Sequence, residues 1–291
     1  IIDDYTIINA IKGKNIILLK YLYNLRYASF PNLKILNKNR SFLEIACKLG
    51  NLDLVIWLNH YLYESNPKNV FYFASKFGYL HILNWLLENR KDLNIQCDEK
   101  VCDIAAINGH LEIVELLFNL IIYCTSKAII GAAMNGHIDI LEYIKKNNDC
   151  PSTYEAMDLA AMNGHLDTII WLYNNRKEGC SKDAMDLASK NGYLDIVKWL
   201  HYNLDIGCTK AAMDNAAERG HLDIVRWLYN NRDEGCSSKA LIMAAIMGHI
   251  SIVKFLLNKV KVSFDKQLIL KTYKLGRFTI SNLLNDHLLK S

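Results

Sequence analysis

The chain has 291 residues, of which 51% are hydrophobic and 22% are charged, and its formal net charge at pH 7 is +4. This composition excludes a largely disordered chain, and so mild a charge does not require a polyanionic partner. The longest apolar runs, such as residues 241–247, are much shorter than the roughly 20 residues of a membrane-spanning helix, so we expect no membrane partner.

The sequence repeats itself with a period close to 28 residues. Residues 181–208 and 209–236 are identical at 16 of 28 positions. Glycines that we call turn glycines mark the register at Gly50, Gly78, Gly109, Gly136, Gly164, Gly192, Gly220, Gly248 and Gly276. Such self-similarity is typical of stacked-repeat proteins. We therefore predict one array over residues 1–291, with about eight repeats in residues 41–263 between degenerate caps at 1–40 and 264–291.

Before each turn glycine the pattern predicts a short helix. Side chains able to cap its free amide groups stand at Asp98, Thr125, Ser181, Thr209 and Ser237, each directly after a cysteine. An apolar residue follows each of these cysteines by five positions, so we expect the two to pack as a hydrophobic staple of one helix. Paired small residues such as Ala160–Ala161 and Ala216–Ala217 would let neighbouring helices approach closely.

After each turn glycine the pattern predicts a second helix. An acid in its first turn, for example Asp195 or Asp223, suits the positive end of the helix dipole. An apolar stripe follows that is wide enough to pack against two neighbours, as at Ile196, Val197, Trp199 and Leu200. The tryptophans of this stripe could stack on nucleic-acid bases, but their position favours core packing for Trp57, Trp85, Trp171, Trp199 and Trp227.

The repeat resembles a known family. The runs AAMNGHLDTIIWL (160–172) and AAERGHLDIVRWL (216–228) resemble the Ala-Ala, Gly-His and Leu-Glu-Ile-Val text of the ankyrin repeat. The resemblance covers residues 41–285 and implies an all-α, ankyrin-like solenoid of stacked helix-turn-helix repeats. Because that family has a period of about 33, we expect its β-hairpin fingers to be shortened or absent here. The composition and the phrase WLYNNR resemble the ankyrin sets of giant amoeba-infecting viruses.

One position departs from the ankyrin pattern. The family carries a loop-bracing histidine six residues before the turn glycine, where this chain has Asp103, Asp158, Asp186 and Asp214. The sequence leaves open whether aspartate makes the same hydrogen bonds.

Two ladders of residues could be mistaken for reactive sites. Histidines that follow the turn glycine lie about 10 Å apart in a stack, too far to share a zinc ion, and the resemblance implies that they brace the turn. No C-x-x-C pair occurs, and we expect all eight cysteines to be reduced, which favours an intracellular, reducing compartment and, with the viral resemblance, the host cytoplasm. No phosphate loop or Ser/His/Asp set interrupts the repeats, so we expect no enzyme activity, metal or cofactor.

Function should lie where the repeats disagree, because positions fixed by stacking must agree. The two residues before each turn glycine vary most, and ankyrin repeats commonly contact partners there. We therefore predict a non-enzymatic protein-interaction scaffold or adaptor. Its contact row is predicted at Phe77, Ile107, Asn108, Met134, Asn135, Met162, Asn163, Lys190, Asn191, Glu218, Arg219, Ile246 and Met247. The apolar members would form one exposed patch if they all face solvent, although some could pack on neighbouring repeats.

Host proteins are the expected partners of a monomeric chain, and the sequence leaves open whether it is a ubiquitin-ligase adaptor or a structural scaffold. The alternative function is nucleic-acid binding through a basic face. Its members would be Lys198, Arg226, Lys254, Arg176, Arg232, Lys100, Lys127, Lys182, Lys210 and Lys239. Interspersed Asp and Glu dilute this face, so nucleic acid is the less favoured partner.

Overall fold

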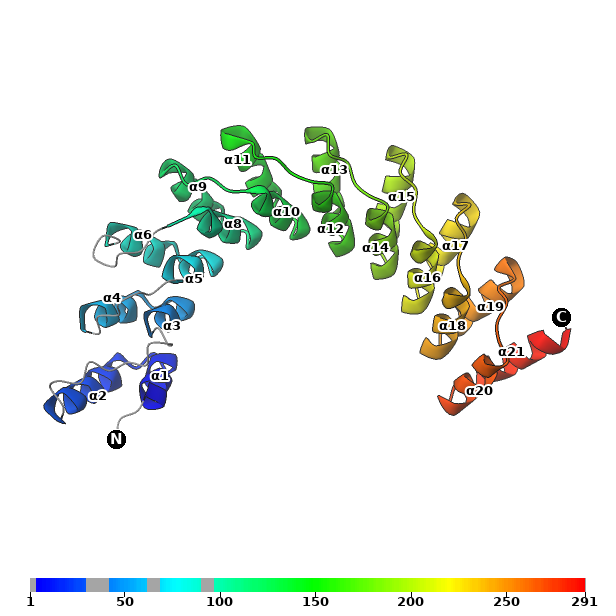
Figure 1. The fold of residues 1–291 in the computed structure, drawn as a ribbon, viewed down its shortest axis with the longest axis horizontal. Helices are drawn as coiled ribbons and strands as arrows, with labels where there is room; N and C mark the ends of the chain where they lie inside the picture. The colour runs from blue at the N-terminus through cyan, green and yellow to red at the C-terminus, as the bar shows by residue number, and fades with distance from the viewer. Residues whose placement is uncertain (1–3, 30–41, 62–68, 90–96, 291) are drawn as a thin grey trace. The chain divides into compact units, whose positions relative to one another are not determined.

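The computed structural model describes residues 4–29, 42–61, 69–89 and 97–290, and every regular element within these residues is helical (Figure 1). Each turn glycine separates a first helix from a second helix, as the sequence predicts. The residues divide into unit 1, residues 1–128 and 139–150, and unit 2, residues 129–138 and 151–291. Part of the cap predicted at 1–40 lies outside the described residues.

The described helices of unit 1 form four pairs. They are α1 (Asp4–Lys12) with α2 (Ile16–Ser29), α3 (Phe42–Leu49) with α4 (Leu52–Tyr61), α5 (Val70–Lys76) with α6 (Leu80–Glu88), and α8 (Glu99–Ile107) with α9 (Leu111–Asn119). The next pair, α10 (Ser126–Met134) and α11 (Ile138–Asn148), is divided between the two units.

The remaining helices belong to unit 2. They are α12 (Glu155–Asn163) with α13 (Leu166–Asn175), α14 (Asp183–Asn191) with α15 (Leu194–Asn203), α16 (Lys210–Arg219) with α17 (Leu222–Asn231), α18 (Ser238–Met247) with α19 (Ile250–Phe255), and α20 (Gln267–Lys274) with α21 (Phe278–Lys290). A π-helical turn, Leu256–Val260, follows α19 directly.

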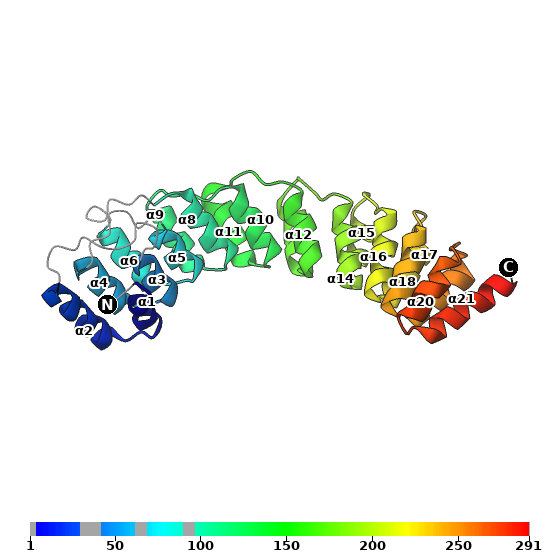
Figure 2. The ribbon, with the colours of Figure 1, turned by 60° about the horizontal axis from the view of Figure 1, so that its bottom comes forward.

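The first helices of unit 2 stack side by side. Helices α12, α14, α16 and α18 follow one another along the unit in both views (Figures 1 and 2). The paired small residues lie between them, and Ala160, Ala188, Ala216 and Ala244 have no exposed surface. Small side chains at these points allow the close helix spacing that a stack of thin repeats needs.

The turn between the two helices of a pair requires glycine for two reasons. Gly192 has φ +89°, a left-handed conformation that side chains rarely adopt. A Cβ atom at this position would also lie 2.7 Å from the His221 ring, which belongs to the next repeat and packs against the turn. The histidine ladder therefore braces the turn of the preceding repeat, and Tyr193 does the same at Gly164.

The second helices pack through an aromatic ladder. Edge-to-face contacts join Tyr173 to Trp199 at 5.4 Å and Tyr229 to Phe255 at 5.4 Å, in each case between neighbouring repeats. Trp199 is consequently half-buried, whereas Trp57 is buried. The tryptophans are packing residues, as predicted, but four of the five lie at the edge of the core.

Buried aspartates join consecutive repeats. The Asp158 carboxylate accepts hydrogen bonds from the Ser181 backbone amide at 2.9 Å and from the Ser181 hydroxyl at 2.7 Å. The Ser181 hydroxyl in turn accepts from the Asp183 amide at 3.1 Å and so caps the next helix. The same arrangement, which we call the aspartate clamp, recurs at Asp103 with Thr125, Asp186 with Thr209, and Asp214 with Ser237.

The aspartate clamp answers the question that the sequence leaves open. Aspartate does brace the start of the following helix, through the residue predicted as its cap. The caps at Thr125, Ser181, Thr209 and Ser237 are confirmed, whereas the one at Asp98 is wrong because its side chain makes no capping bond. Burial raises the pKa of the Asp158 and Asp186 carboxyl groups above their ordinary values.

The expectation that all cysteines are reduced is wrong for one pair. Cys102 and Cys124 form a disulfide, with their Cα atoms 5.1 Å apart. Cys124 is bonded to the preceding repeat, and Cys102 stands where other repeats carry Met157, Met185 or Met213. Two cysteines therefore meet at this junction alone among those described. The reducing compartment, which rested on reduced thiols, stays a prediction.

The other cysteines before caps are poor nucleophiles. Burial raises the pKa of the Cys180 and Cys208 thiols to about 12 and that of Cys236 to about 11, and the neighbouring carboxylates add to this effect. Because only the thiolate is reactive, these side chains are packing residues at neutral pH.

The junction after α18 has a different construction. Ile242 occupies the position of the clamp aspartate and is half-buried. Asp265 occupies the capping position of α20, where its carboxylate accepts a hydrogen bond from the Gln267 amide at 3.1 Å. Helix α20 therefore caps itself without a bond from the preceding repeat.

Candidate protein interface

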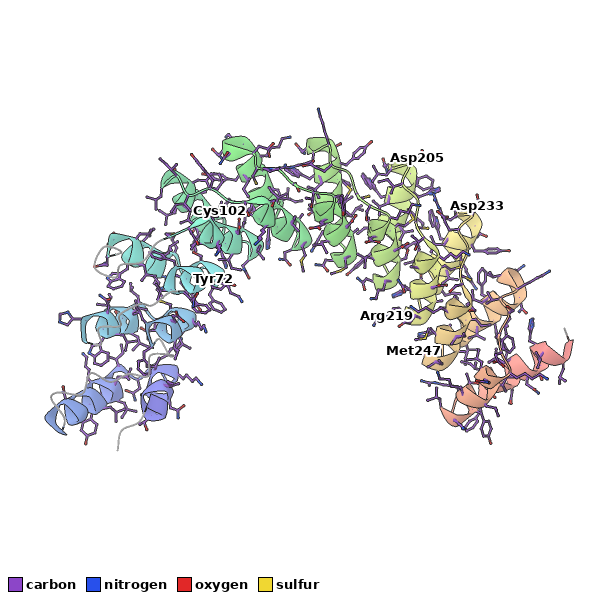
Figure 3. The ribbon with its side chains drawn as sticks, viewed as in Figure 1. Tyr72, Cys102, Asp205, Arg219, Asp233 and Met247 are labelled. Atoms are coloured by element: carbon purple, nitrogen blue, oxygen red, sulfur yellow. A yellow bond between two sulfur atoms is a disulfide. The ribbon has the colours of Figure 1, made fainter. Side chains whose placement is uncertain are left out.

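The contact row lies at the carboxyl ends of the first helices. In unit 2, Arg219 and Met247 point from α16 and α18 on the side formed by the first helices, whereas Asp205 and Asp233 lie on the opposite side (Figure 3). Of the predicted row, Phe77, Asn108, Asn135, Asn191, Arg219 and Met247 are exposed, and Ile107, Met134, Met162, Asn163, Lys190, Glu218 and Ile246 are half-buried.

The apolar members of the row are divided between the units. Phe77 and Ile107 belong to unit 1 and the others to unit 2, where Lys190 and Glu218 stand between Met162 and Ile246. Only Phe77 and Met247 are well exposed, at 44% and 46%. The condition for a single exposed patch, that all the apolar members face solvent, is not met, because Met134, Met162 and Ile246 are half-buried.

The main chain two residues before the turn glycine takes part in stacking. The Glu218 carbonyl accepts a hydrogen bond from His249 Nε2 at 3.0 Å, and the Lys76 carbonyl accepts one from His110 Nε2 at 3.1 Å. In both cases the histidine comes from the next repeat. Two residues before each of these turn glycines, the backbone carbonyl thus bonds to the next repeat, and the side chain takes no part in this bond.

Two predicted contact residues have a structural role. Asn163 donates from its side-chain amide to the Met134 carbonyl at 2.7 Å, and Asn191 donates to the Met162 carbonyl at 2.7 Å. These asparagines join consecutive repeats of unit 2. Their amide groups are therefore less available to a partner than the sequence suggests.

The sequence reasoning missed one further position of the same helical face. Five residues before the turn glycine, half-buried side chains lie one helical turn below the contact row, at Ile45, Phe73, Ile104, Leu159, Leu187, Asn215 and Met243. Residues three and four apart on a helix are neighbours on its surface. Counting three and four residues towards the N-terminus from the contact row would have identified these positions in the sequence.

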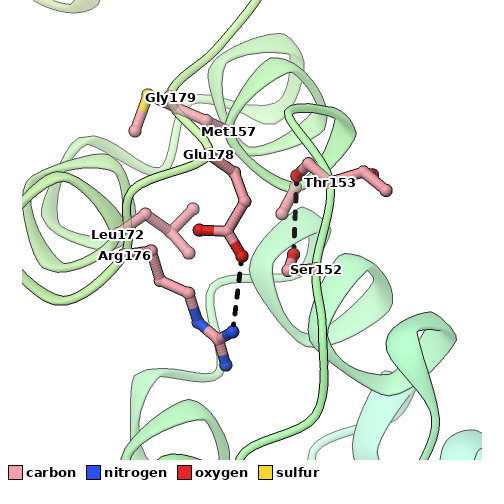
Figure 4. Close-up of a pocket in the computed structure, with 8 residues that line it drawn as sticks. Ser152, Thr153, Met157, Leu172, Arg176, Glu178 and Gly179 are labelled. Atoms are coloured by element: carbon pink, nitrogen blue, oxygen red, sulfur yellow. Dashed lines mark hydrogen bonds and ion pairs between the residues drawn. The ribbon is translucent and has the colours of Figure 1, made fainter.

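The basic face proposed for nucleic acid has fewer free charges than its sequence suggests. The Arg176 side chain is only 7% exposed and lies 3.5 Å from Glu178 (Figure 4). Arg232 forms an ion pair with Glu234, whose pKa its hydrogen bond lowers to about 2, and Lys239 lies 3.5 Å from Glu218. Lys198, Arg226 and Lys254 remain exposed on the second helices.

A small pocket in unit 2 contains the Arg176–Glu178 pair. It lies between α12, α13 and the loop after α13, and its lining residues are Ser152, Thr153, Ala156, Met157, Leu172, Arg176, Glu178 and Gly179 (Figure 4). The space holds about one water molecule. The pocket is therefore part of the loop packing.

The described residues contain no cluster of three or more His, Cys, Asp or Glu side chains that could hold a metal ion. None of their helices combines the length and apolar content that crossing a bilayer requires.

Sequence comparison agrees with this geometry. Residues 103–186 and 184–267 each match the family described as ankyrin repeats (3 copies), and residues 70–118 match ankyrin repeats (many copies). The chain belongs to the ankyrin-repeat family. No curated protein sequence matches it.

The ankyrin assignment confirms the predicted fold class. The chain is an all-α solenoid of stacked helix-turn-helix repeats, and the part described has no strand, in agreement with shortened or absent β-hairpin fingers. Ankyrin repeats are generally protein–protein interaction modules and typically lack catalytic activity.

Proposed function

We propose that this ankyrin chain is a non-enzymatic scaffold or adaptor that binds partner proteins through the side chains of its contact row. Host proteins are the partners that the sequence favours. The proposal concerns the first-helix side of each unit, separately for unit 1 and unit 2.

The proposal rests on the different roles of the main chain and the side chains at the two residues before the turn glycines. Carbonyl groups such as those of Lys76 and Glu218 hold the next repeat, and this backbone bond does not depend on which side chain the residue carries. The side chains at the two positions before the turn glycines differ from repeat to repeat and include exposed Phe77 and Met247. Surface side chains that differ while the scaffold beneath them stays constant are a feature of recognition surfaces.

The test uses the full chain and a displayed library of random peptides. Peptides that bind the wild-type protein are selected, and their affinities are then measured for the Met162→Glu/Ile246→Glu variant. We expect a loss of at least tenfold for peptides that bind unit 2, because a buried apolar contact is replaced by an unpaired carboxylate.

The matched control is the Lys198→Glu/Arg226→Glu variant, which places two new carboxylates on the second helices. Peptides that bind the contact row should retain their affinity for it. Selected peptides that ignore every contact-row change but lose affinity for the control variant would overturn the choice of face.

A further inference from the structure

The α5–α6 pair of unit 1 differs from its neighbours at the turn. Acids occupy the third position after the turn glycine at Asp53, Glu112, Asp139, Asp167, Asp195 and Asp223. At this position the α5–α6 pair has His81, and the two residues before its glycine are Lys76 and Phe77. The turn therefore has His81 where most other turns have an acid, and the basic Lys76 and aromatic Phe77 precede it.

The side chains around this turn form an aromatic-basic cluster, which we define as Lys48, Phe73, Lys76, Phe77, Tyr79 and His81. The Lys48 ammonium lies 3.9 Å from the centre of the Phe73 ring. The Lys76 ammonium lies 5.9 Å from the centre of the Phe77 ring and 6.0 Å from that of Tyr72, which Figure 3 marks on α5. Ring contacts of 6.1 Å then link Phe77 to Tyr79 and Tyr79 to His81.

The two ammonium groups of the cluster lack a carboxylate partner within the described part of the chain. The nearest acid along α3, Glu44, accepts hydrogen bonds from the Asn69 backbone amide at 3.0 Å and from its side-chain amide at 3.1 Å. Glu44 is thus occupied in joining α3 to α5. A positive field next to an exposed ring is left for an external group.

We infer that the aromatic-basic cluster binds a short acidic segment of a partner protein, in which a carboxylate lies next to an apolar side chain. The carboxylate would be held between Lys48 and Lys76, and the apolar side chain would pack on Phe77, which is 44% exposed. This inference rests on the proposed protein-binding function and gives it a partner chemistry.

A nucleic acid fits the cluster less well than an acidic peptide. Base stacking needs open ring faces, but the Phe73 face is covered by the Lys48 ammonium at 3.9 Å. Asp53 and Glu112 also lie at the turns on either side, so a phosphate backbone following the helix ends would meet repulsion after one repeat. A segment with one or two carboxylates avoids both obstacles.

The experiment selects peptides from the same displayed library with the full chain and then measures their binding to variants. Lys48→Glu/Lys76→Glu reverses the cluster's charge, and Phe77→Ala removes the exposed ring. Among the selected peptides we expect a group with Asp or Glu within two residues of an apolar residue. Their affinity should fall about tenfold or more with either variant and should not change with Lys198→Glu/Arg226→Glu, which carries the same change in charge.

A second charge variant, Lys48→Gln/Lys76→Gln, keeps the test decisive if the reversed variant does not fold, and thermal unfolding by circular dichroism checks each protein. Selected peptides that lack acids, or that bind the charge variants as well as wild type, would overturn the inference. The inference would also be overturned if an oligothymidylate competed with the peptides and lost its own binding in the charge variants. That result would assign the cluster to nucleic acid.

The outcomes separate this inference from the proposed function. Peptides sensitive to Met162→Glu/Ile246→Glu but insensitive to all cluster variants would leave the protein-binding function standing and remove the acidic-segment inference. Peptides insensitive to both sets of variants, or an absence of selected peptides, would count against both.

Discussion

The junction after α8 and the junction after α18 use the same positions of the repeat but are joined differently. After α8, Asp103 binds the amide and hydroxyl groups of Thr125, both at 2.7 Å, and the neighbouring residues form the Cys102–Cys124 disulfide. After α18, Ile242 takes the place of the aspartate, and α20 caps itself.

The difference shows that stacking strength is set by a few residues on top of a common apolar core. Both junctions bury small and branched side chains between helices, including Ala105, Ala106, Ala244 and Ala245, all with no exposed surface. Only the junction after α8 adds hydrogen bonds between repeats that fix where the next helix begins. We therefore expect local stability to differ between repeats that look alike in sequence.

Breaking the disulfide should have the largest effect. The bond closes a 22-residue separation, and loop-closure entropy for such a length predicts a stabilisation of about 3 kcal/mol. Urea unfolding of the wild-type chain should therefore shift to lower urea when a reductant is added. Cys102→Met, which copies the residue of sibling repeats, should unfold at the same urea concentration with or without reductant. A wild-type midpoint that ignores the reductant would contradict the prediction.

Removing a clamp should have the next largest effect. Asp186→Ala removes two hydrogen bonds that Thr209 donates to a buried carboxylate, so we expect a loss of about 2 kcal/mol in the free energy of unfolding. Asp186→Asn keeps one acceptor oxygen and should lose less than half as much. Equal losses in the two variants would mean that packing, and not hydrogen bonding, joins the repeats here.

Building a clamp where none exists would sharpen the comparison. Ile242→Asp alone should destabilise the end of unit 2, because the new carboxylate faces Asp265. Combined with Asp265→Ser, it recreates the acid and hydroxyl pair of Asp214 and Ser237. A double-mutant cycle on unfolding free energies should give a favourable coupling of about 1 kcal/mol. Strict additivity would show that this junction is too open for the clamp to form.

The smallest effect concerns pH. Burial raises the folded pKa of Asp186 above its unfolded value near 3.9, so the folded state binds this proton more tightly. Relative to Asp186→Asn, the wild-type chain should therefore lose stability as pH rises through the interval between the two pKa values and show a constant difference above it. Urea unfolding of both proteins across this interval gives the measurement. A wild-type free energy of unfolding that rises with pH relative to that of Asp186→Asn would contradict the sign.

Periodicity was sufficient to predict the helices, the turn glycines and four of the five caps, because every repeat packs in the same way. It failed where a side chain acts between repeats. The partner of Cys124 could not be found within its own helix, since it is Cys102 of the repeat before. Asn163 and Asn191 likewise varied enough to resemble contact residues while serving the stack.

The contact row stays a prediction, and the exposure of its side chains could not be predicted from the sequence. Exposure depends on how closely each side chain packs against the neighbouring repeat, so Met162 is half-buried and Met247 is exposed. The aromatic-basic cluster lies partly outside the predicted row, because Lys48 comes from a neighbouring repeat and reaches Phe73 through space.

The backbone hydrogen bonds at Lys76 and Glu218 have a consequence for how such a protein can change over time. A carbonyl group is supplied by every amino acid, so a mutation at these residues alters the surface presented to a ligand and preserves the bond to the next repeat. New binding preferences can then arise one codon at a time without a compensating change elsewhere. The same residues are the natural positions to randomise when a combinatorial library is built on this scaffold.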